Sequence, residues 1–254
     1  MYRGKGYGKE KCMAIIEINN VKKVYPLGKV EVHAVKGVTF SIEKGDFISI
    51  AGPSGSGKST ILNMIGLIDK PTEGEVFIDG KATSGLSDKE LTRFRHEVLG
   101  FIFQSFNLIP VLNVWENIEF PLLLGKTRIQ ASEKADWIDW LMNEVGLTEW
   151  KTHKPNELSG GQRQRVAIAR ALVTKPQIVL ADEPTANLDS TTGEQIIELM
   201  KKINRELETT FIFSTHDAKI VEVADHIIRL RDGLIIENRR RGEDSAAGLN
   251  RSEE

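Results

Sequence analysis

The segment that most constrains the fold of this chain is a glycine-rich stretch at residues 52–60, with the sequence GPSGSGKST. It matches the pattern G-x-x-x-x-G-K-[ST]; an apolar stretch at residues 47–50 precedes it, and residues with helical character follow it. Glycines let the backbone curl so that successive N–H groups point at phosphate oxygens, and the following helix adds its positive N-terminal end. A chance glycine-rich loop is the alternative, but the flanking strand and helix favour a phosphate-binding loop in an α/β fold.

Within this loop we expect Lys58 to reach the β- and γ-phosphates of ATP and the Ser59 hydroxyl to bind Mg²⁺. The residues expected to hold the nucleotide here are Gly52, Ser54, Gly55, Ser56, Gly57, Lys58, Ser59 and Thr60.

A second candidate is the apolar run at residues 178–181, which ends in two carboxylates, Asp182 and Glu183. Such a run is typical of a buried strand in a parallel sheet, where ligands bind at the carboxyl ends of the strands. We therefore expect Asp182 to hold Mg²⁺, and Glu183 to act as general base toward the attacking water. A solvated acidic turn is the alternative, and the neighbouring phosphate-binding loop argues against it.

The segment LSGGQ at residues 158–162 predicts a second anion-binding helix terminus. Ser159 can cap a helix that runs to about residue 173, and the glycines allow a close backbone approach. One nucleotide needs one phosphate-binding loop, so we expect Ser159, Gly160, Gly161 and Gln162 to serve the nucleotide of another copy of this chain. An ordinary capped helix is the alternative.

Along the chain, predicted strands alternate with predicted helices, which indicates a mainly parallel sheet. Residues 15–24 and 35–42 are predicted strands, separated by a loop that contains Pro26 and Gly28, and Ser87 with Glu90 forms a capping-box pattern. Residues 105–156 are predicted to be mostly helical and to form a lobe inserted in a domain that spans residues 13–238. We expect residues 1–12 to be a disordered tail and residues 239–254 a charged one.

The composition excludes several classes of protein. The net charge is -2, from 34 basic and 36 acidic residues, so no general attraction to nucleic acid is expected. Cys12 is the only cysteine, which excludes an internal disulfide. No apolar run approaches the roughly 20 residues that span a bilayer, and no signal peptide is apparent at the start. The chain is expected to be cytosolic, or attached to a membrane only through a partner.

Taken together, the motifs resemble the nucleotide-binding domain of ABC transporters. In that family a P-loop, a glutamine loop, the LSGGQ signature, an acidic strand end, a D-loop and a switch histidine follow one another in this order, over roughly residues 15–238 here. The resemblance implies a P-loop core with a parallel sheet, an N-terminal antiparallel β lobe and an inserted α-helical lobe.

The resemblance also assigns roles to four further residues. It implies that Gln104 contacts Mg²⁺ and the attacking water, that His216 bonds the γ-phosphate, that Tyr25 stacks on adenine, and that Asp189 orders the site of a facing subunit. The catalytic set would then be Glu183, His216, Gln104 and Lys58. Plainer alternatives are a strand-end polar residue, a structural histidine, a half-buried tyrosine and a helix cap.

Residues 51–74 and 180–190 further resemble the ATPases of lipoprotein-releasing and macrolide-efflux systems, the LolD and MacB type. Ala186 departs from that branch, which usually has Gly there, and residues 25–33 are expected to form the extended loop that suits it. The branch implies an ATP-hydrolysing subunit that forms an ATP-dependent head-to-tail dimer. It also implies a separate integral membrane permease and a peripheral location on the cytoplasmic face of the membrane.

Residues 104–112 are the expected docking site of the permease. The stretch at residues 106–112 is strongly apolar, but Asn107 and Pro110 predict a loop, and loops lie on the surface. The alternative is that these side chains close the core of the helical lobe.

Two other functions are weighed. A soluble ABC ATPase acting on DNA or ribosomes would usually carry two such domains or a long coiled coil, and neither is present. A catalytically inactive subunit would lack some of the chemistry, whereas Lys58, Asp182, Glu183 and His216 are all present. The transported cargo is not encoded here, because its specificity would lie in the permease.

Overall fold

The computed structural model describes residues 14–28, 30–125 and 129–241, so the predicted tail at residues 1–12 and most of that at 239–254 lie outside it. In the described part a six-stranded sheet forms the centre, in the order β10-β9-β3-β8-β7-β6. Its strands are β3 Phe47–Ala51, β6 Leu99–Ile102, β7 Ile178–Asp182, β8 Thr210–Thr215, β9 His226–Arg231 and β10 Leu234–Arg240. All run parallel except β10, which pairs antiparallel with β9 at the edge. β10 extends to Arg240, so the charged tail does not begin at residue 239 as predicted.

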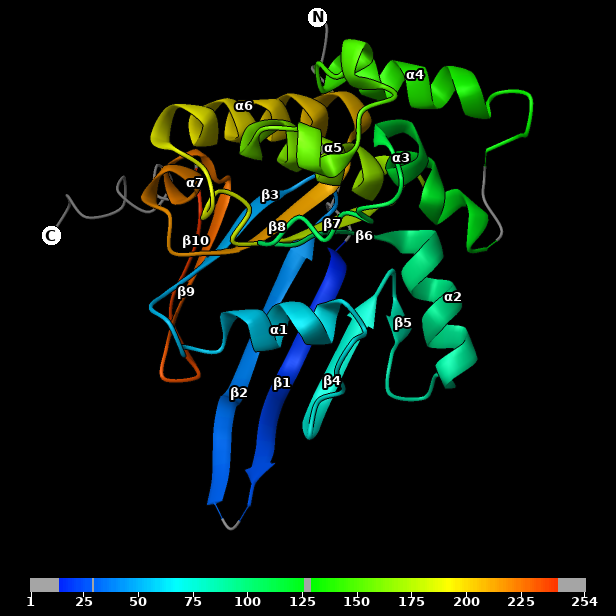
Figure 1. Ribbon diagram of the computed structural model, residues 1–254. Coiled ribbons are helices and arrows are strands. Elements are labelled where there is room, and N and C mark those ends of the chain that lie inside the picture. The colour runs from blue at the N-terminus through cyan, green and yellow to red at the C-terminus, as the bar shows by residue number, and fades with distance from the viewer. Residues whose placement is uncertain (1–13, 29, 126–128, 242–254) are drawn as a thin grey trace, which may run out of the picture.

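The central sheet is buried on both faces, because successive residues of its strands point to opposite sides. In β7, Ile178 and Leu180 belong to one apolar cluster, whereas Val179 and Ala181 belong to the other. Helices α5 Gly160–Leu172, α6 Ser190–Leu207 and α7 Ala218–Val223 contribute to the second cluster, and α1 Lys58–Ile65 and α2 Asp88–Val98 to the first. Figure 1 shows α5 and α6 above the sheet and α1 below it.

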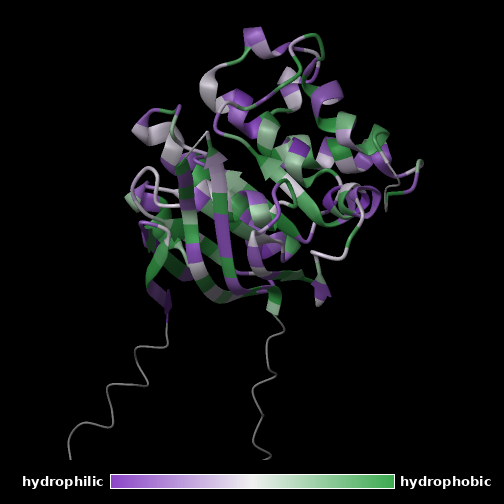
Figure 2. Cartoon of the chain, turned by 90° about the horizontal axis from the view of Figure 1, so that it is seen from below, coloured by the Kyte–Doolittle hydropathy of each residue, from purple (hydrophilic) through white to green (hydrophobic). Residues whose placement is uncertain are grey.

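A four-stranded antiparallel sheet covers the α1 side, again within the described residues. It has the order β2-β1-β4-β5 and consists of β1 Ala14–Leu27, β2 Val30–Glu43, β4 Glu73–Ile78 and β5 Lys81–Ala82. Figure 2 shows hydrophobic and hydrophilic residues alternating along these strands. The fold class is therefore the predicted one: a parallel core and an N-terminal antiparallel β lobe.

The prediction of a loop at residues 25–33 is wrong. Both strands continue through it, Tyr25 pairs with Val32, and Leu27 pairs with Val30. Pro26 is tolerated because it lies beyond the last residue of β1 that pairs with β4, so only one neighbour strand has to be satisfied. Gly28 supplies the turn, with a left-handed φ of 63°.

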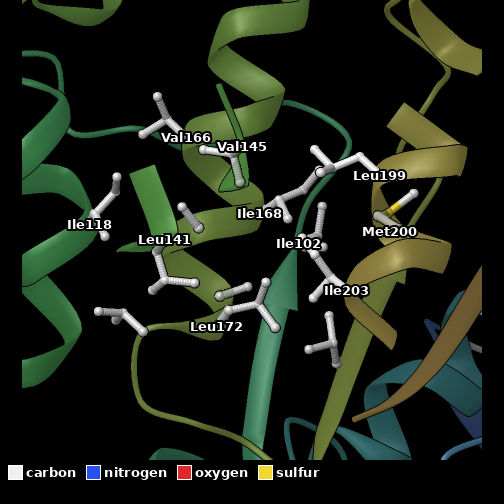
Figure 3. Close-up of a cluster of buried hydrophobic side chains, with 14 of the residues drawn as sticks. Ile102, Ile118, Leu141, Val145, Val166, Ile168, Leu172, Leu199, Met200 and Ile203 are labelled. Atoms are coloured by element: carbon white, nitrogen blue, oxygen red, sulfur yellow. The ribbon is translucent and has the colours of Figure 1, made fainter. Parts of the chain in front are cut away.

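The middle of the chain is helical, as predicted. It contains α3 Val114–Leu123, α4 Lys134–Glu144 and two short 3₁₀ helices, η1 Thr148–Trp150 and η2 Pro155–Glu157. Figure 3 shows side chains of α3, α4, α5, α6 and β6 pointing toward one another, among them Ile118, Leu141, Ile168 and Ile102. The helical lobe thus shares one apolar cluster with α5 and α6, which follow it in the sequence. No helix in the described residues is long and apolar enough to cross a membrane.

Candidate nucleotide site

The glycine-rich loop joins β3 to α1, which places it at the carboxyl edge of the central sheet. Two of its glycines are required by close backbone contacts. Gly57 has a φ of 102°, and a Cβ there would lie 2.5 Å from the carbonyl oxygen of Ala34. A Cβ on Gly52 would lie 2.3 Å from the carbonyl oxygen of Leu230. The loop is therefore seated against β2 and β9, and a larger residue at either position would displace it.

Polar groups inside the loop are arranged for an anion. Lys58 is 7% exposed, and its Nζ donates to the carbonyl oxygen of Pro53 at 3.0 Å, so the ammonium folds back over the loop. The Ser56 hydroxyl is buried and has no hydrogen-bond partner in the described part of the chain. Lys58, Ser59 and Thr60 line the adjoining cavity at the N-terminus of α1, so an oxygen-rich anion such as a phosphate fits this cradle.

Beside the loop lies a cavity of about 780 Å³, formed where the hairpin β1–β2 meets the carboxyl ends of the central strands. The residues that line it are Tyr25, Val32, His33, Ala34, Pro53, Ser54, Gly55, Gly57, Lys58, Ser59, Thr60, Gln104, Asp182, Glu183 and His216. Residues predicted from separate motifs therefore meet in one place. Sequence reasoning missed Val32, His33 and Ala34, because their segment was interpreted as a loop rather than as a strand facing the cavity.

Two of the three predicted Mg²⁺ ligands are adjacent. The Ser59 hydroxyl donates to Oδ1 of Asp182 at 3.2 Å, and Gln104 lines the same cavity. Hydroxyl, carboxylate and amide oxygens are hard ligands of the kind that Mg²⁺ accepts together with phosphate oxygens. The donor set therefore fits this ion.

Glu183 is held by two neighbours at the end of β8. Its Oε1 lies 2.8 Å from Nδ1 of His216, and its Oε2 accepts a hydrogen bond from Thr215 Oγ1 at 3.2 Å. The Glu183 backbone is left-handed, with a φ of 46°, and its N–H donates to the carbonyl oxygen of Ser214 at 2.9 Å. The Glu183 side chain is 16% exposed and that of His216 70%, so the carboxylate is shielded while the imidazole faces solvent. Thr215 was not singled out from the sequence.

The LSGGQ segment has the predicted cap. Ser159 Oγ accepts from the N–H of Gln162 at 3.3 Å, and Gln162 Oε1 accepts from the N–H of Ser159 at 2.8 Å. Gly160 and Gly161 form the first turn of α5, and Gly161 lies so close to α6 that a Cβ would be 2.6 Å from a methyl of Thr192. None of these described residues lines the cavity beside the glycine-rich loop.

Asp189 caps α6. Its carboxylate accepts from Oγ1 of Thr192 at 2.6 Å and from the N–H of Thr192 at 3.0 Å, and these hydrogen bonds hold the pKa of Asp189 below its ordinary value. This is the plainer of the two roles considered for Asp189. Asp189 is not among the described residues that line the cavity, and its contact with a facing subunit stays a prediction.

The segment that follows Gln104 is anchored by side chains from other elements. Arg170 of α5 donates to the carbonyl oxygens of Phe106 and Asn107, at 2.7 and 2.5 Å, and Asn187 donates to that of Gln104 at 2.8 Å. Burial lowers the pKa of Arg170. Its two carbonyl partners belong to residues with left-handed φ values of 60° and 49°.

The apolar side chains of this segment are only partly covered. Phe106, Leu108, Ile109 and Leu112 are each half-buried, and Val111 is 73% exposed. Full burial of all four side chains in the core of the helical lobe would exclude a docking loop. They are not fully buried, so docking at this segment stays a prediction.

Comparison with known proteins agrees with this geometry. The family model described as ABC transporter matches residues 35–186. The lipoprotein-releasing system ATP-binding protein LolD 1 of Rhodopseudomonas palustris is 43% identical over 87% of this chain and 98% of its own length. The macrolide export ATP-binding/permease protein MacB of Bdellovibrio bacteriovorus is 45% identical over 87% of this chain and 33% of its own length.

A solved structure is similar as well. It is the dimeric structure of a post-hydrolysis state of the ATP-binding cassette MJ0796, from Methanocaldococcus jannaschii, bound to ADP and Pi. It is 47% identical to this chain, with a TM-score of 0.80, and the match covers 89% of this chain and 98% of that one. The similarity therefore extends to the whole cassette.

Proposed function

The chain belongs to the ABC transporter family as an ATP-binding, ATP-hydrolysing cassette, and we propose that it uses MgATP to drive a separate membrane-embedded permease. The observation that carries this proposal is the cavity in which the phosphate loop, the Ser59–Asp182 pair and the Glu183–His216 pair face one another. The ATPase domain would extend from residue 13 to the end of β10 at residue 240, with a helical lobe at about residues 105–156 and a tail at either end.

Each residue of the cavity then has a role. The backbone of residues 52–60 and Lys58 bind the phosphates, and Tyr25 supports the adenine. Ser59, Asp182 and Gln104 hold Mg²⁺, which when bound neutralises charge on the phosphate oxygens. Glu183 accepts the proton of the attacking water. Its carboxylate is oriented by His216 and Thr215. Because the His216 side chain is largely exposed on the cavity side, it is also able to hydrogen-bond the γ-phosphate.

The site is completed by a second copy. Ser159, Gly160, Gly161 and Gln162 form a capped helix terminus that does not reach the described cavity of its own chain, so they are available to the nucleotide of a facing copy. The solved structure of the similar cassette is dimeric, which supports this arrangement. ATP closes the head-to-tail pair, hydrolysis lets it reopen, and this movement acts on the permease.

The permease would dock at residues 104–112, which places the chain on the cytoplasmic face of the membrane without spanning it. The segment joins Gln104 in the cavity to the half-buried apolar loop, and Arg170 fixes it to α5. Docking there would connect the permease to both the Mg²⁺ site and the helix that LSGGQ begins. The names of LolD and MacB suggest export or lipoprotein release as the output.

The proposal is tested by steady-state ATP hydrolysis with the full chain. Hydrolysis should require Mg²⁺, stop when EDTA is added, and be lost in Lys58→Ala, which removes the phosphate-binding ammonium. The matched control is Lys89→Ala on the exposed surface of α2, which should hydrolyse ATP like the original chain. A chain that does not hydrolyse ATP, or a Lys58→Ala variant with full activity, would overturn the proposal.

A further inference from the structure

We propose that Asp69, together with Lys23, positions Tyr25 as the surface on which the nucleobase stacks, so that Asp69 determines how much the base contributes to binding. This inference rests on the proposed function, because Tyr25 lines the cavity in which ATP is proposed to bind. Asp69 itself is not among the described residues that line this cavity. It would act on the base only through the tyrosine.

The first observation is that both carboxylate oxygens of Asp69 are engaged by β1. The Tyr25 hydroxyl donates to Oδ2 at 2.5 Å, and the Lys23 ammonium donates to Oδ1 at 2.5 Å. The same ammonium donates to the carbonyl oxygen of Lys70 at 2.7 Å. The tyrosine is thus held at its tip by a carboxylate that is itself fixed by an ion pair.

The second observation concerns the faces of the tyrosine ring. The Lys23 Nζ lies over the ring, 4.8 Å from its centroid. A cation over one aromatic face is attracted by the ring and leaves the opposite face for another group. Because Tyr25 lines the cavity and Lys23 is not among the described residues that do, the face opposite Lys23 would be the one offered to a base.

Tyr25 needs such an anchor because of its place in the fold. Beyond Lys22, β1 pairs with β2 but no longer with β4, so Tyr25 lies on a two-stranded ribbon whose tip residue Leu27 is 70% exposed. A two-stranded ribbon is only marginally stable alone. A stacking residue on it would lose its orientation without a contact to the body of the domain.

Asp69 is well placed to provide that contact. It lies in the loop after α1, where its N–H and that of Ile68 both donate to the carbonyl oxygen of Asn63, at 3.2 and 2.9 Å. Thr72, in the same loop, accepts from the N–H of Val24 at 3.1 Å. The helix that follows the phosphate loop is therefore connected through Asp69 to the residue proposed to hold the base.

The protonation states agree with this arrangement. Partial burial alone would raise the pKa of Asp69, but hydrogen bonds from Lys23 and Tyr25 and the charge of Lys23 hold it below its ordinary value. Burial and the bond to Asp69 raise the pKa of Tyr25. At neutral pH the carboxylate is ionised and the phenol keeps the proton that it donates.

The test compares a ligand that has a base with one that lacks it. The KM and kcat for ATP and the inhibition constant of inorganic tripolyphosphate are measured for the full chain and for Asp69→Ala, Asp69→Asn and Tyr25→Phe. The matched control is Glu73→Ala, which breaks the neighbouring ion pair (2.7 Å) between Lys22 of β1 and Glu73 of β4 without removing a partner of Tyr25.

In Asp69→Ala the KM for ATP should rise at least about fivefold, within the range that a base-stacking contact supplies. The inhibition constant of tripolyphosphate should stay within about twofold, because the phosphate loop is intact. Tyr25→Phe keeps the ring but loses the hydroxyl and with it the bonds to Asp69 and Thr60, so it should show at least a similar rise, and Asp69→Asn, which leaves Thr60 in place, a smaller one. Glu73→Ala should match the original chain.

The inference is overturned if Asp69→Ala and Tyr25→Phe bind ATP as well as Glu73→Ala does. It is also overturned if the constants for ATP and tripolyphosphate rise together, since that would indicate general damage to the site. Should Asp69→Ala fail to fold, Tyr25→Phe and Asp69→Asn decide the question. An original chain that does not hydrolyse ATP would instead refute the proposed function, so the two failures are distinguishable.

Discussion

The two edges of the central sheet both pair a histidine with a carboxylate, but in opposite surroundings. At the carboxyl edge His216 bonds Glu183, and the imidazole is 70% exposed to the cavity. At the amino edge His226 begins β9, is 2% exposed and lies near Asp46, with 3.7 Å between Nδ1 and the carboxylate.

The amino edge also closes on itself. Arg240 at the end of β10 reaches both oxygens of Asp46, at 3.1 and 2.9 Å, and Oδ1 of Asn238 accepts a hydrogen bond from Nε2 of His226 at 2.6 Å. Charged groups there face one another, whereas at the carboxyl edge Lys58, Asp182 and Glu183 line a cavity of about 780 Å³. The difference indicates that one edge stabilises the fold and the other is kept for a ligand, as is usual for parallel sheets.

The largest effect should follow Glu183→Gln, which keeps the size of the side chain but removes its basicity. Hydrolysis should fall by about two to four orders of magnitude, the contribution of a positioned general base, while ATP binding survives. Single-turnover hydrolysis and equilibrium ATP binding measure the two quantities. Glu198→Gln on the exposed face of α6 is the control and should change neither. A Glu183→Gln variant that hydrolyses ATP at the rate of the original chain would contradict the catalytic role assigned to the carboxyl edge.

An effect of intermediate size is expected at the amino edge, where a substitution should change the stability of the fold and not the activity. Asp46→Asn removes the nearer of the two carboxylate partners of Arg240, the other being Glu43 at 3.4 Å, and should lower the free energy of unfolding by about 2 kcal/mol, the size of a hydrogen bond to a charged group. Urea unfolding at neutral pH measures it, and the KM for ATP should not change. A loss of activity without a loss of stability would contradict the division between the edges.

The same variant has a predicted dependence on pH. Burial alone would raise the pKa of Asp46, but the nearby His226 imidazole and hydrogen bonds from Arg240 and the Glu43 N–H hold it below its ordinary value of 3.8. A depressed carboxyl pKa stabilises the fold above the ordinary value, and this stabilisation is lost as the pH falls through the folded value. The difference between Asp46→Asn and the original chain should therefore shrink in acid. A difference that grows on acidification would contradict this assignment.

The smallest effect concerns the base. Tyr25 is the one residue to which a base contact is assigned, and stacking tolerates every base because each has a π-face. GTP should therefore be hydrolysed within about tenfold of ATP, which corresponds to roughly 1.4 kcal/mol. Steady-state rates with the two nucleotides decide it. A much larger preference for ATP would mean that the cavity makes specific contacts with the base.

Sequence reasoning succeeded where the chemistry is local. The phosphate loop, the strand that ends at Asp182 and the cap at Ser159 are each contiguous, so their residue types predict their geometry. It succeeded less well where contacts join distant segments. Thr215 reaches Glu183 across neighbouring strands, and Asp69 meets Tyr25 from 44 residues away in the sequence.

The continuation of hairpin β1–β2 through residues 25–33 was missed for a different reason. Pro26 and Gly28 are turn residues by local preference, and local preference does not say which strand neighbours a residue has. With β4 ending its pairing at Lys22, a proline in β1 has no third strand to satisfy. The antiparallel direction of β10 was also not predicted, although Asp232 and Gly233, the two residues between β9 and β10, are typical of a hairpin turn.

The central claim is that the nucleotide cavity of one chain is completed by residues 159–162 of a second. Because ATP binds the closed pair, persistence of uncleaved ATP should hold two copies together by mass action. Size-exclusion chromatography with light scattering on Glu183→Gln tests this directly. The account predicts a monomer without nucleotide or with ADP and a dimer with ATP. Ser159→Arg on the same background should abolish the dimer by placing bulk where the phosphate must lie. A Glu183→Gln chain that stays monomeric in excess ATP would contradict the claim for the isolated subunit.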